Sequence, residues 1–69
     1  MGIRKLRNEI RRKIKKLRLQ KNLSQEKLAE YVNMSREHIS CIECGKNLAS
    51  VETLYYMAKF FEVDIKYFF

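Results

Sequence analysis

Residues 23–46 read LSQEKLAEYVNMSREHISCIECGK, and their pattern predicts two short helices joined by a tight turn. Ser24 and Ser35 each stand directly before a run with helical apolar spacing, where a side-chain oxygen can accept hydrogen bonds from free backbone N–H groups. Asn33 lies between the runs, and Asn is the non-glycine residue that most readily adopts the left-handed backbone of a sharp turn. We therefore expect one helix to begin at each serine.

The apolar residues of each run recur at helical spacing, so they should share the face that packs inward. Gly45 follows the second run, where its freedom to adopt a positive φ favours the end of a helix. The predicted inward-facing residues are Leu28, Ala29 and Val32 in the first helix, and Ile39 and Ile42 in the second. Gln25 is expected on the outer side of the first helix.

The first 21 residues are strongly basic. They hold ten of the fifteen Lys and Arg residues of a 69-residue chain with a formal net charge of +7, and only Glu9 opposes them. Such a concentration of positive charge is typical of contact with phosphate. A solvated helix face, or a helix that lies on a membrane surface or a partner, is the alternative, although no aromatic anchor precedes Tyr31. Apolar residues at three- and four-residue spacing predict an amphipathic helix here: Ile3, Leu6, Ile10, Ile14 and Leu17.

Length and composition limit the classes of function. A chain of 69 residues makes one domain, at a size where a second copy would help to complete the core. It has no apolar run long enough to span a membrane and no signal-peptide pattern, so we expect a cytoplasmic protein without a membrane partner. One His, two Cys and scattered carboxylates form no catalytic constellation. We expect no enzyme, no cofactor and no small-molecule ligand.

Cys41 and Cys44 form a C-x-x-C pair, and His38 lies three residues before Cys41. Tetrahedral zinc takes four ligands in structural sites, and the chain contains no other Cys or His. Thiols three residues apart on an intact helix are poorly placed for a disulfide. We expect no metal site and two reduced thiols, with metal binding or redox sensing as the alternative.

Two segments carry a resemblance to a known family. RLQKNLSQEKLAE at residues 18–30 and MSREHISCIECGK at residues 34–46 resemble the phage Cro and repressor helix-turn-helix family, also called XRE-type, and the similarity continues from Ser50 to Phe69. The resemblance implies an all-α, compact five-helix, lambda-repressor-like DNA-binding domain. This domain would cover residues 10–69, with the helix-turn-helix at about residues 24–45. Residues 1–9 would be a basic N-terminal extension, continuous with the first helix.

The resemblance also implies roles for individual residues. Because the second helix of the motif enters the major groove, the expected base contacts come from Ser35, Arg36, Glu37, Ser40 and Cys41. The expected phosphate contacts are Arg18, Gln25, Lys46 and Asn47. Arg18 is also expected to pair with Glu43 and so to orient that helix. Arg36 is the main candidate for a guanine contact, and Glu37 could accept from cytosine unless it pairs with Arg36 instead.

Seven of the eight aromatic residues fall in the last fifteen positions. Ser50 should open a helix whose inward stripe is Val51, Leu54, Met57, Ala58 and Phe61, and Asp64 should cap a short fifth helix. One small core cannot bury every aromatic ring, and members of the resembled family commonly dimerise here. Ordinary surface exposure is the alternative. The expected interface residues are Tyr55, Tyr56, Phe60, Tyr67 and Phe69.

These features together predict a sequence-specific, double-stranded DNA-binding transcriptional regulator. We expect a repressor or autoregulator that binds an inverted repeat as a homodimer, with half-sites about one helical turn apart. The alternative is an antitoxin or other protein-interaction module, in which the aromatic C-terminal region grips a partner and DNA binding is secondary. The basic N-terminal segment favours the first hypothesis.

Overall fold

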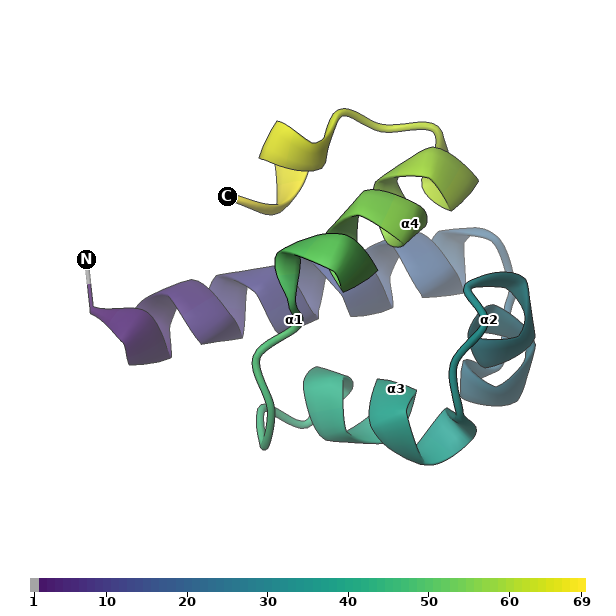
Figure 1. Ribbon diagram of the computed structural model, residues 1–69, viewed down its shortest axis with the longest axis horizontal. Helices are drawn as coiled ribbons and strands as arrows, with labels where there is room; N and C mark the ends of the chain where they lie inside the picture. The colour runs from purple at the N-terminus through teal and green to yellow at the C-terminus, as the bar shows by residue number, and fades with distance from the viewer. Residues whose placement is uncertain (1) are drawn as a thin grey trace.

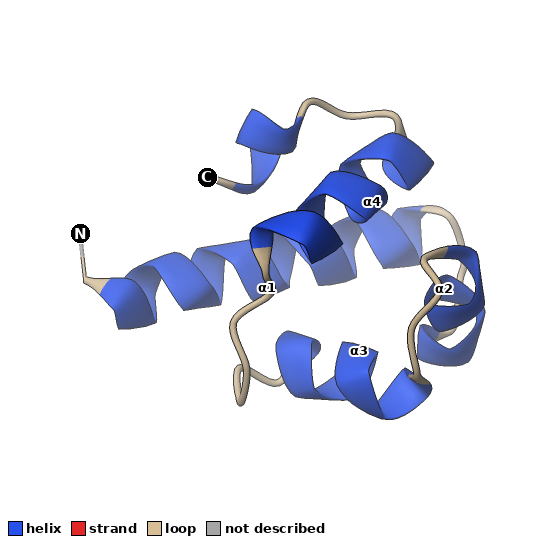
Figure 2. Cartoon of the chain, in the orientation of Figure 1, coloured by secondary structure: helices blue, strands red, loops and turns tan. Residues whose placement is uncertain are grey.

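The computed structural model describes residues 2–69, so Met1 of the predicted extension lies outside the described residues. The elements in chain order are α1 (Ile3–Gln20), α2 (Gln25–Tyr31), α3 (Arg36–Glu43), α4 (Val51–Phe61) and the 3-10 helix η1 (Ile65–Phe68). Figure 1 shows α1 running the length of the molecule behind α4, with α2 at one end and α3 along the lower edge. Residues 2–69 contain no strand (Figure 2). The all-helical prediction is therefore confirmed for this part of the chain.

The short fifth helix expected after Asp64 is the 3-10 helix η1. Asp64 caps it as expected, because its Oδ1 accepts a hydrogen bond of 2.9 Å from the backbone N–H of Lys66. The backbone N–H of Tyr67 then donates to the Asp64 carbonyl at 2.8 Å, which is the tighter i to i+3 pattern. Four residues are too few for successive i to i+4 bonds, so residues 2–69 hold four α-helices followed by one 3-10 helix.

Serine hydroxyls open three of the helices, as the sequence predicts. The Oγ atoms of Ser24, Ser35 and Ser50 accept hydrogen bonds of 3.0–3.1 Å from the backbone N–H three residues ahead. Each serine has an extended backbone, which is the conformation of an N-cap residue. A cap of this kind contributes about 1 kcal/mol to a helix. The capping pattern therefore determines where α2, α3 and α4 begin.

Left-handed backbone ends several of the helices. Asn33 has φ of +59° in the turn between α2 and α3, and Gly45 has φ of +86° after α3, both as expected. Asn22, after α1, has φ of +57°, which the sequence analysis did not predict. Glu62 also adopts the left-handed region, with φ of +58°, at the end of α4. Its Cβ makes that conformation costly, so Glu62 carries backbone strain.

The core lies between α1 on one side and α2, α3, α4 and η1 on the other. Phe68 of η1 is fully buried, and η1 packs on both α1 and α4. Val51 was predicted to face inward but is 69% exposed, whereas Thr53, in the same turn of α4, is buried at 4% exposure. The buried apolar residues are Ile10, Ile14, Leu28, Ala29, Val32, Ile39, Ile42, Ala49, Leu54, Met57, Ala58, Phe61 and Phe68.

Replacing Glu62 by glycine should raise the free energy of unfolding by about 0.5–1 kcal/mol. Glycine removes the Cβ penalty of about 1–2 kcal/mol in the left-handed region but adds conformational freedom to the unfolded chain. Urea denaturation measures the change. The matched control is Glu30→Gly, at an exposed position in α2, which should lower the same free energy by about 1 kcal/mol. A loss of stability in Glu62→Gly would contradict the assignment of strain.

Candidate nucleic-acid interface

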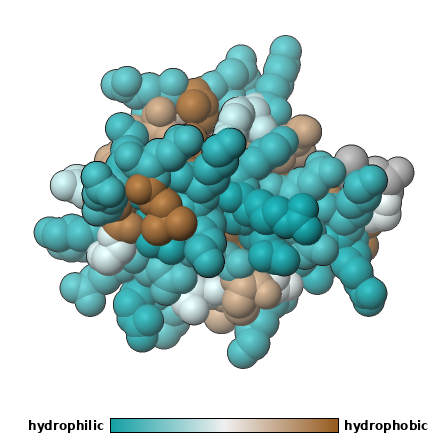
Figure 3. Space-filling view, turned by 180° about the vertical axis from the view of Figure 1, so that it is seen from behind, coloured by the Kyte–Doolittle hydropathy of each residue, from teal (hydrophilic) through white to brown (hydrophobic). Residues whose placement is uncertain are grey.

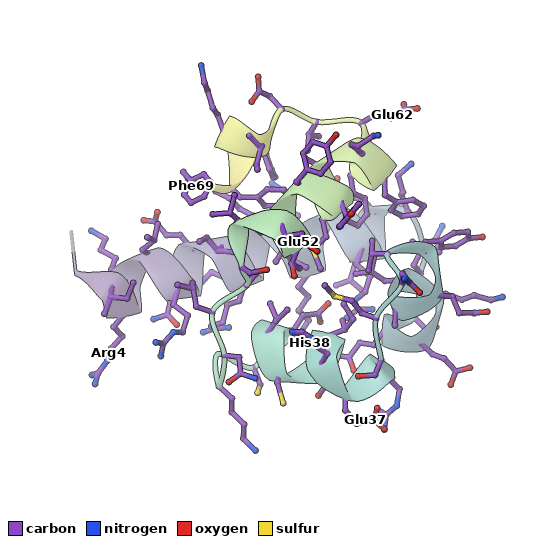
Figure 4. The ribbon with its side chains drawn as sticks, viewed as in Figure 1. Arg4, Glu37, His38, Glu52, Glu62 and Phe69 are labelled. Atoms are coloured by element: carbon purple, nitrogen blue, oxygen red, sulfur yellow. The ribbon has the colours of Figure 1, made fainter. Side chains whose placement is uncertain are left out.

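Helix α3 is anchored by its apolar side and leaves its polar side open. Ile39 and Ile42 are buried against the core, and α3 packs against α1 and α2. Arg36, Glu37 and His38, in its first turn, are all exposed. Figure 4 shows α3 along the edge of the molecule with Glu37 projecting away from the other helices. The N-terminal turn of α3 is therefore accessible to a binding partner at this edge of the molecule.

The structure brings the five residues predicted to contact bases onto this one helix and its cap. Arg36 and Glu37 are exposed, whereas Ser40 and Cys41, one turn later, are half-buried. Ser35 uses its Oγ as an acceptor for the cap, so its hydroxyl hydrogen is still available to donate. No ion pair joins Glu37 to Arg36 in the described part of the chain. The charged groups of Arg36 and Glu37 both remain free for a ligand.

Arg18 and Glu43 form a buried, two-pronged ion pair. The Nε of Arg18 donates to Oε2 of Glu43 at 2.7 Å, and its Nη2 donates to Oε1 at 2.9 Å. The remaining Nη1 donates to the carbonyl of Leu23 at 2.8 Å, and Gln25 Nε2 donates to Glu43 Oε1 at 3.2 Å. These contacts join the C-terminal parts of α1 and α3 to the start of α2. The family resemblance implied this pair, and the geometry places it at the junction of three helices.

The hydrogen bonds to Glu43 change what can be expected of Arg18 and Gln25, two of the predicted phosphate-binding residues. Arg18 is only 7% exposed and all three of its guanidinium nitrogens are engaged, so the geometry does not support its second role on phosphate. Gln25 was expected on the outer side of α2 but is half-buried, with its amide turned to Glu43. An amide nitrogen has two hydrogens, so Gln25 retains one donor for a ligand.

The loop after α3 holds the other two predicted phosphate contacts. Lys46 and Asn47 are exposed, and their backbone N–H groups both donate to the Cys41 carbonyl, at 3.0 and 3.2 Å. Arg11 of α1 lies directly against this loop, because a Cβ on Gly45 would sit 3.4 Å from both Cδ and Nε of Arg11. The sequence analysis did not single out Arg11. Its spacing of seven residues from Arg18 would have indicated that both lie on the same side of α1.

The cysteines and His38 do not assemble a metal site. Cys41 is half-buried and Cys44 is exposed, both with free thiols, and the Cys44 thiol points to the Cys41 carbonyl at 3.5 Å. Residues 2–69 contain no group of three or more His, Cys, Asp or Glu side chains placed to hold a metal ion.

The five aromatic residues predicted for a dimer interface divide into two groups. Tyr55, Tyr56 and Phe69 are exposed, like Val51. Phe60 is half-buried, with its ring stacked on Tyr31 at a centroid distance of 4.8 Å, beside an open groove of about 590 Å³ between α4 and the α2–α3 turn. Tyr67 is also half-buried, with the Nζ of Lys13 5.5 Å from its ring centroid. The exposed group is the part of the predicted interface that the fold leaves uncovered.

The face opposite to the view of Figure 1, which α1 crosses, is mostly hydrophilic with scattered apolar patches (Figure 3). Ten basic residues of the chain lie at positions 4–21, on α1 and just after it. Within residues 2–69, no helix has both the length and the apolar character needed to cross a membrane.

Replacing Glu43 by glutamine should cost about 3–5 kcal/mol of unfolding free energy, because it leaves the buried Arg18 charge without its partner. The double variant Arg18→Met/Glu43→Gln should recover at least about half of that loss, since it removes the stranded charge. Urea denaturation of the variants measures both effects. The exposed pair Lys27–Glu30, with an Nζ–Oε2 distance of 3.5 Å, is the control: Glu30→Gln should cost less than about 1 kcal/mol. Equal losses for Glu43→Gln and Glu30→Gln would contradict a central role for the buried pair.

Comparisons with known proteins agree with this geometry. Residues 14–68 match a family model described as helix-turn-helix. The HTH-type transcriptional activator BcrR of Enterococcus faecalis is 46% identical over 57 residues, which are 83% of this chain but only 28% of BcrR. An uncharacterized HTH-type transcriptional regulator of Methanocaldococcus jannaschii is 40% identical over 57 residues, covering 83% of this chain and 86% of that protein. With α2 and α3 as its two helices and Asn33 in the turn, the chain belongs to the XRE-type helix-turn-helix family of DNA-binding transcriptional regulators.

Proposed function

We propose that this protein regulates transcription by binding an inverted repeat in double-stranded DNA as a homodimer, in the cytoplasm. The observation that carries the proposal is the presentation of α3: its first turn is exposed and polar, its opposite side is buried, and the Arg18–Glu43 pair holds its far end. An α-helix fits the major groove, where each base pair displays a distinct set of donors and acceptors. A helix held rigidly in this way can read that set.

Base and phosphate contacts come from different residues in this proposal. Arg36 binds O6 and N7 of a guanine through two N–H donors, and Glu37 accepts from N4 of a cytosine. Ser35, Ser40 and Cys41 line the same groove with small side chains. Lys46, Asn47 and the free donor of Gln25 contact phosphates, which position the helix but carry no sequence information.

The exposed residues Val51, Tyr55, Tyr56 and Phe69 form the proposed dimer interface. Aromatic residues concentrate in the centres of interfaces, and closed dimers place the same patch of each copy face to face. Two copies related by a two-fold axis present two α3 helices, so their DNA site is an inverted repeat. Its half-sites lie about 34 Å apart, which is one turn of the double helix.

The sign of regulation has two candidates. Occupying a promoter is sufficient for repression, so a repressor or autoregulator needs nothing beyond the DNA-binding surface described above. The name of BcrR, a transcriptional activator, favours activation as the second candidate. A reporter gene placed behind the protein's own selected DNA site distinguishes them, because repression lowers and activation raises its expression.

Selection from a randomised duplex pool at near-physiological salt should enrich an inverted repeat. Arg36→Ala should relax the preference at one position of each half-site, with a loss of about 1–3 kcal/mol in discrimination and no change in the salt dependence. Lys46→Ala is the matched control, since it should weaken binding to all sequences and lower the salt slope by about 1. A pool without an enriched motif would contradict the proposal and favour a protein-interaction module.

Tyr55→Asp should convert the dimer into a folded monomer. The side chain is exposed in one copy, so a charge there leaves the fold intact but opposes burial against a second copy. Sedimentation or light scattering measures the mass, and circular dichroism checks the fold. The control is Leu19→Asp, at an exposed apolar residue of α1 outside the proposed interface, which should remain dimeric. A parent protein that is monomeric at all concentrations would contradict the dimer.

A further inference from the structure

Four of the five arginines in residues 1–21 lie on one side of α1. At about 100° per residue, Arg4, Arg7, Arg11 and Arg18 fall within a sector of about 60°. Glu9, the one acidic residue of this segment, lies about 140–160° around the helix from Arg4, Arg7 and Arg11. The arginines therefore form a line along α1 that its own carboxylate does not neutralise.

This line faces α3 and the loop that follows it. Arg18 contacts Glu43 at the end of α3, and Arg11 packs on Gly45 in the loop. In Figure 4, Arg4 projects from α1 toward the side of the molecule on which α3 lies. Arg4 is about 10 Å further along the helix axis than Arg11, at 1.5 Å per residue. The line of arginines thus continues the exposed edge of α3 and its loop by about two helical turns.

Arg18 is neutralised by Glu43, but the other three arginines have no acidic partner in the part of the chain that the structure describes. Within residues 2–69 the ion pairs are Arg18–Glu43 and Lys27–Glu30. Arg11 donates from Nε to Asn8 Oδ1 at 3.0 Å, which leaves its charge and its terminal nitrogens free. Arg7 is half-buried, and its Nε is itself buried without a hydrogen-bond partner among the described residues, so an external anion would meet the terminal nitrogens of Arg7. These guanidinium groups are placed for an external anion.

We infer that Arg4, Arg7 and Arg11, here called the arginine row, form an additional phosphate-binding surface that extends the DNA contact of α3 and of Lys46 and Asn47 along the backbone. The planar fork of arginine binds a phosphate through two parallel N–H donors. The row follows the same edge as the loop residues, so it meets phosphates beyond those that the loop contacts. This inference rests on the proposed function, because the arginine row is inferred to contact phosphates of the same duplex that α3 is proposed to bind.

The test compares two triple variants of equal charge. Arg4→Gln/Arg7→Gln/Arg11→Gln removes the row, and Lys5→Gln/Arg12→Gln/Lys16→Gln removes three charges from a different side of α1. Glutamine is a good helix former, and circular dichroism with urea denaturation verifies that both variants fold. Affinity for the selected duplex is measured from about 50 to 200 mM salt, where each phosphate contact contributes about 0.9 to the slope of log K against log salt.

In the row variant, the magnitude of the slope of log K against log salt should fall by about 2–3, and selection should still enrich the motif of the parent. In the control variant, the magnitude should fall by less than about 1. Equal losses in the two variants, or an unchanged slope in the row variant, would overturn the inference while the enriched motif still supports the proposed function. A parent protein without an enriched motif would overturn both. An unchanged slope on DNA, combined with lost binding to anionic lipid vesicles in the row variant, would assign the row to a lipid surface instead.

Discussion

The buried pair between Arg18 and Glu43 couples three helices through directional contacts. All three guanidinium nitrogens of Arg18 donate hydrogen bonds within the chain. Glu43 accepts hydrogen bonds from both Arg18 and Gln25. Removing both charges from water is costly, and such a pair is tolerated only when its geometry satisfies the remaining hydrogen-bonding groups. Apolar packing of Ile39 and Ile42 holds α3 to the core without specifying its orientation. The ion pair adds the missing orientation, because its two parallel hydrogen bonds require one arrangement of α1 and α3.

The position of α3 relative to α1 determines which charges can act together. Residues 22–69 contain five basic and seven acidic residues, so the positive charge of the chain lies on α1 and directly after it. The polar turn that is proposed to read bases lies on α3, at the edge beside which Arg11 packs on Gly45. In the proposed function, attraction to the DNA backbone and discrimination between bases thus belong to different helices. Packing of α1 against α3 joins the two functions in one surface.

Local signals in the sequence predicted much of the fold. The serine caps and the turn at Asn33 were predicted because each depends on residues within one helical turn. The inward stripes of α2 and α3 follow from apolar spacing alone. The same rule failed at Val51, because the buried face of α4 is centred on the side of Thr53, Leu54 and Met57, and the polar Thr53 carries no apolar signal that would have indicated this. At η1 the Asp64 cap was predictable in the same local way, but the sequence did not indicate that the four residues after it adopt the 3-10 pattern.

The candidate site was predictable only where the chemistry is local. The amino-acid sequence alone placed Arg36 and Glu37 in the first exposed turn of a helix, because the Ser35 cap and the apolar positions that follow determine that turn. The resemblance implied the Arg18–Glu43 pair, but tertiary structure decided that Arg18 keeps no free nitrogen for phosphate, that Gln25 turns to Glu43, and that Arg11 lies against the loop after α3. Phe60 and Tyr67 became half-buried in the same way, through contacts with Tyr31 and Lys13. The physical reason is distance along the chain: a cap or a turn is made by neighbouring residues, whereas the neutralisation of a charge depends on a partner 25 positions away that only the packed fold brings within reach.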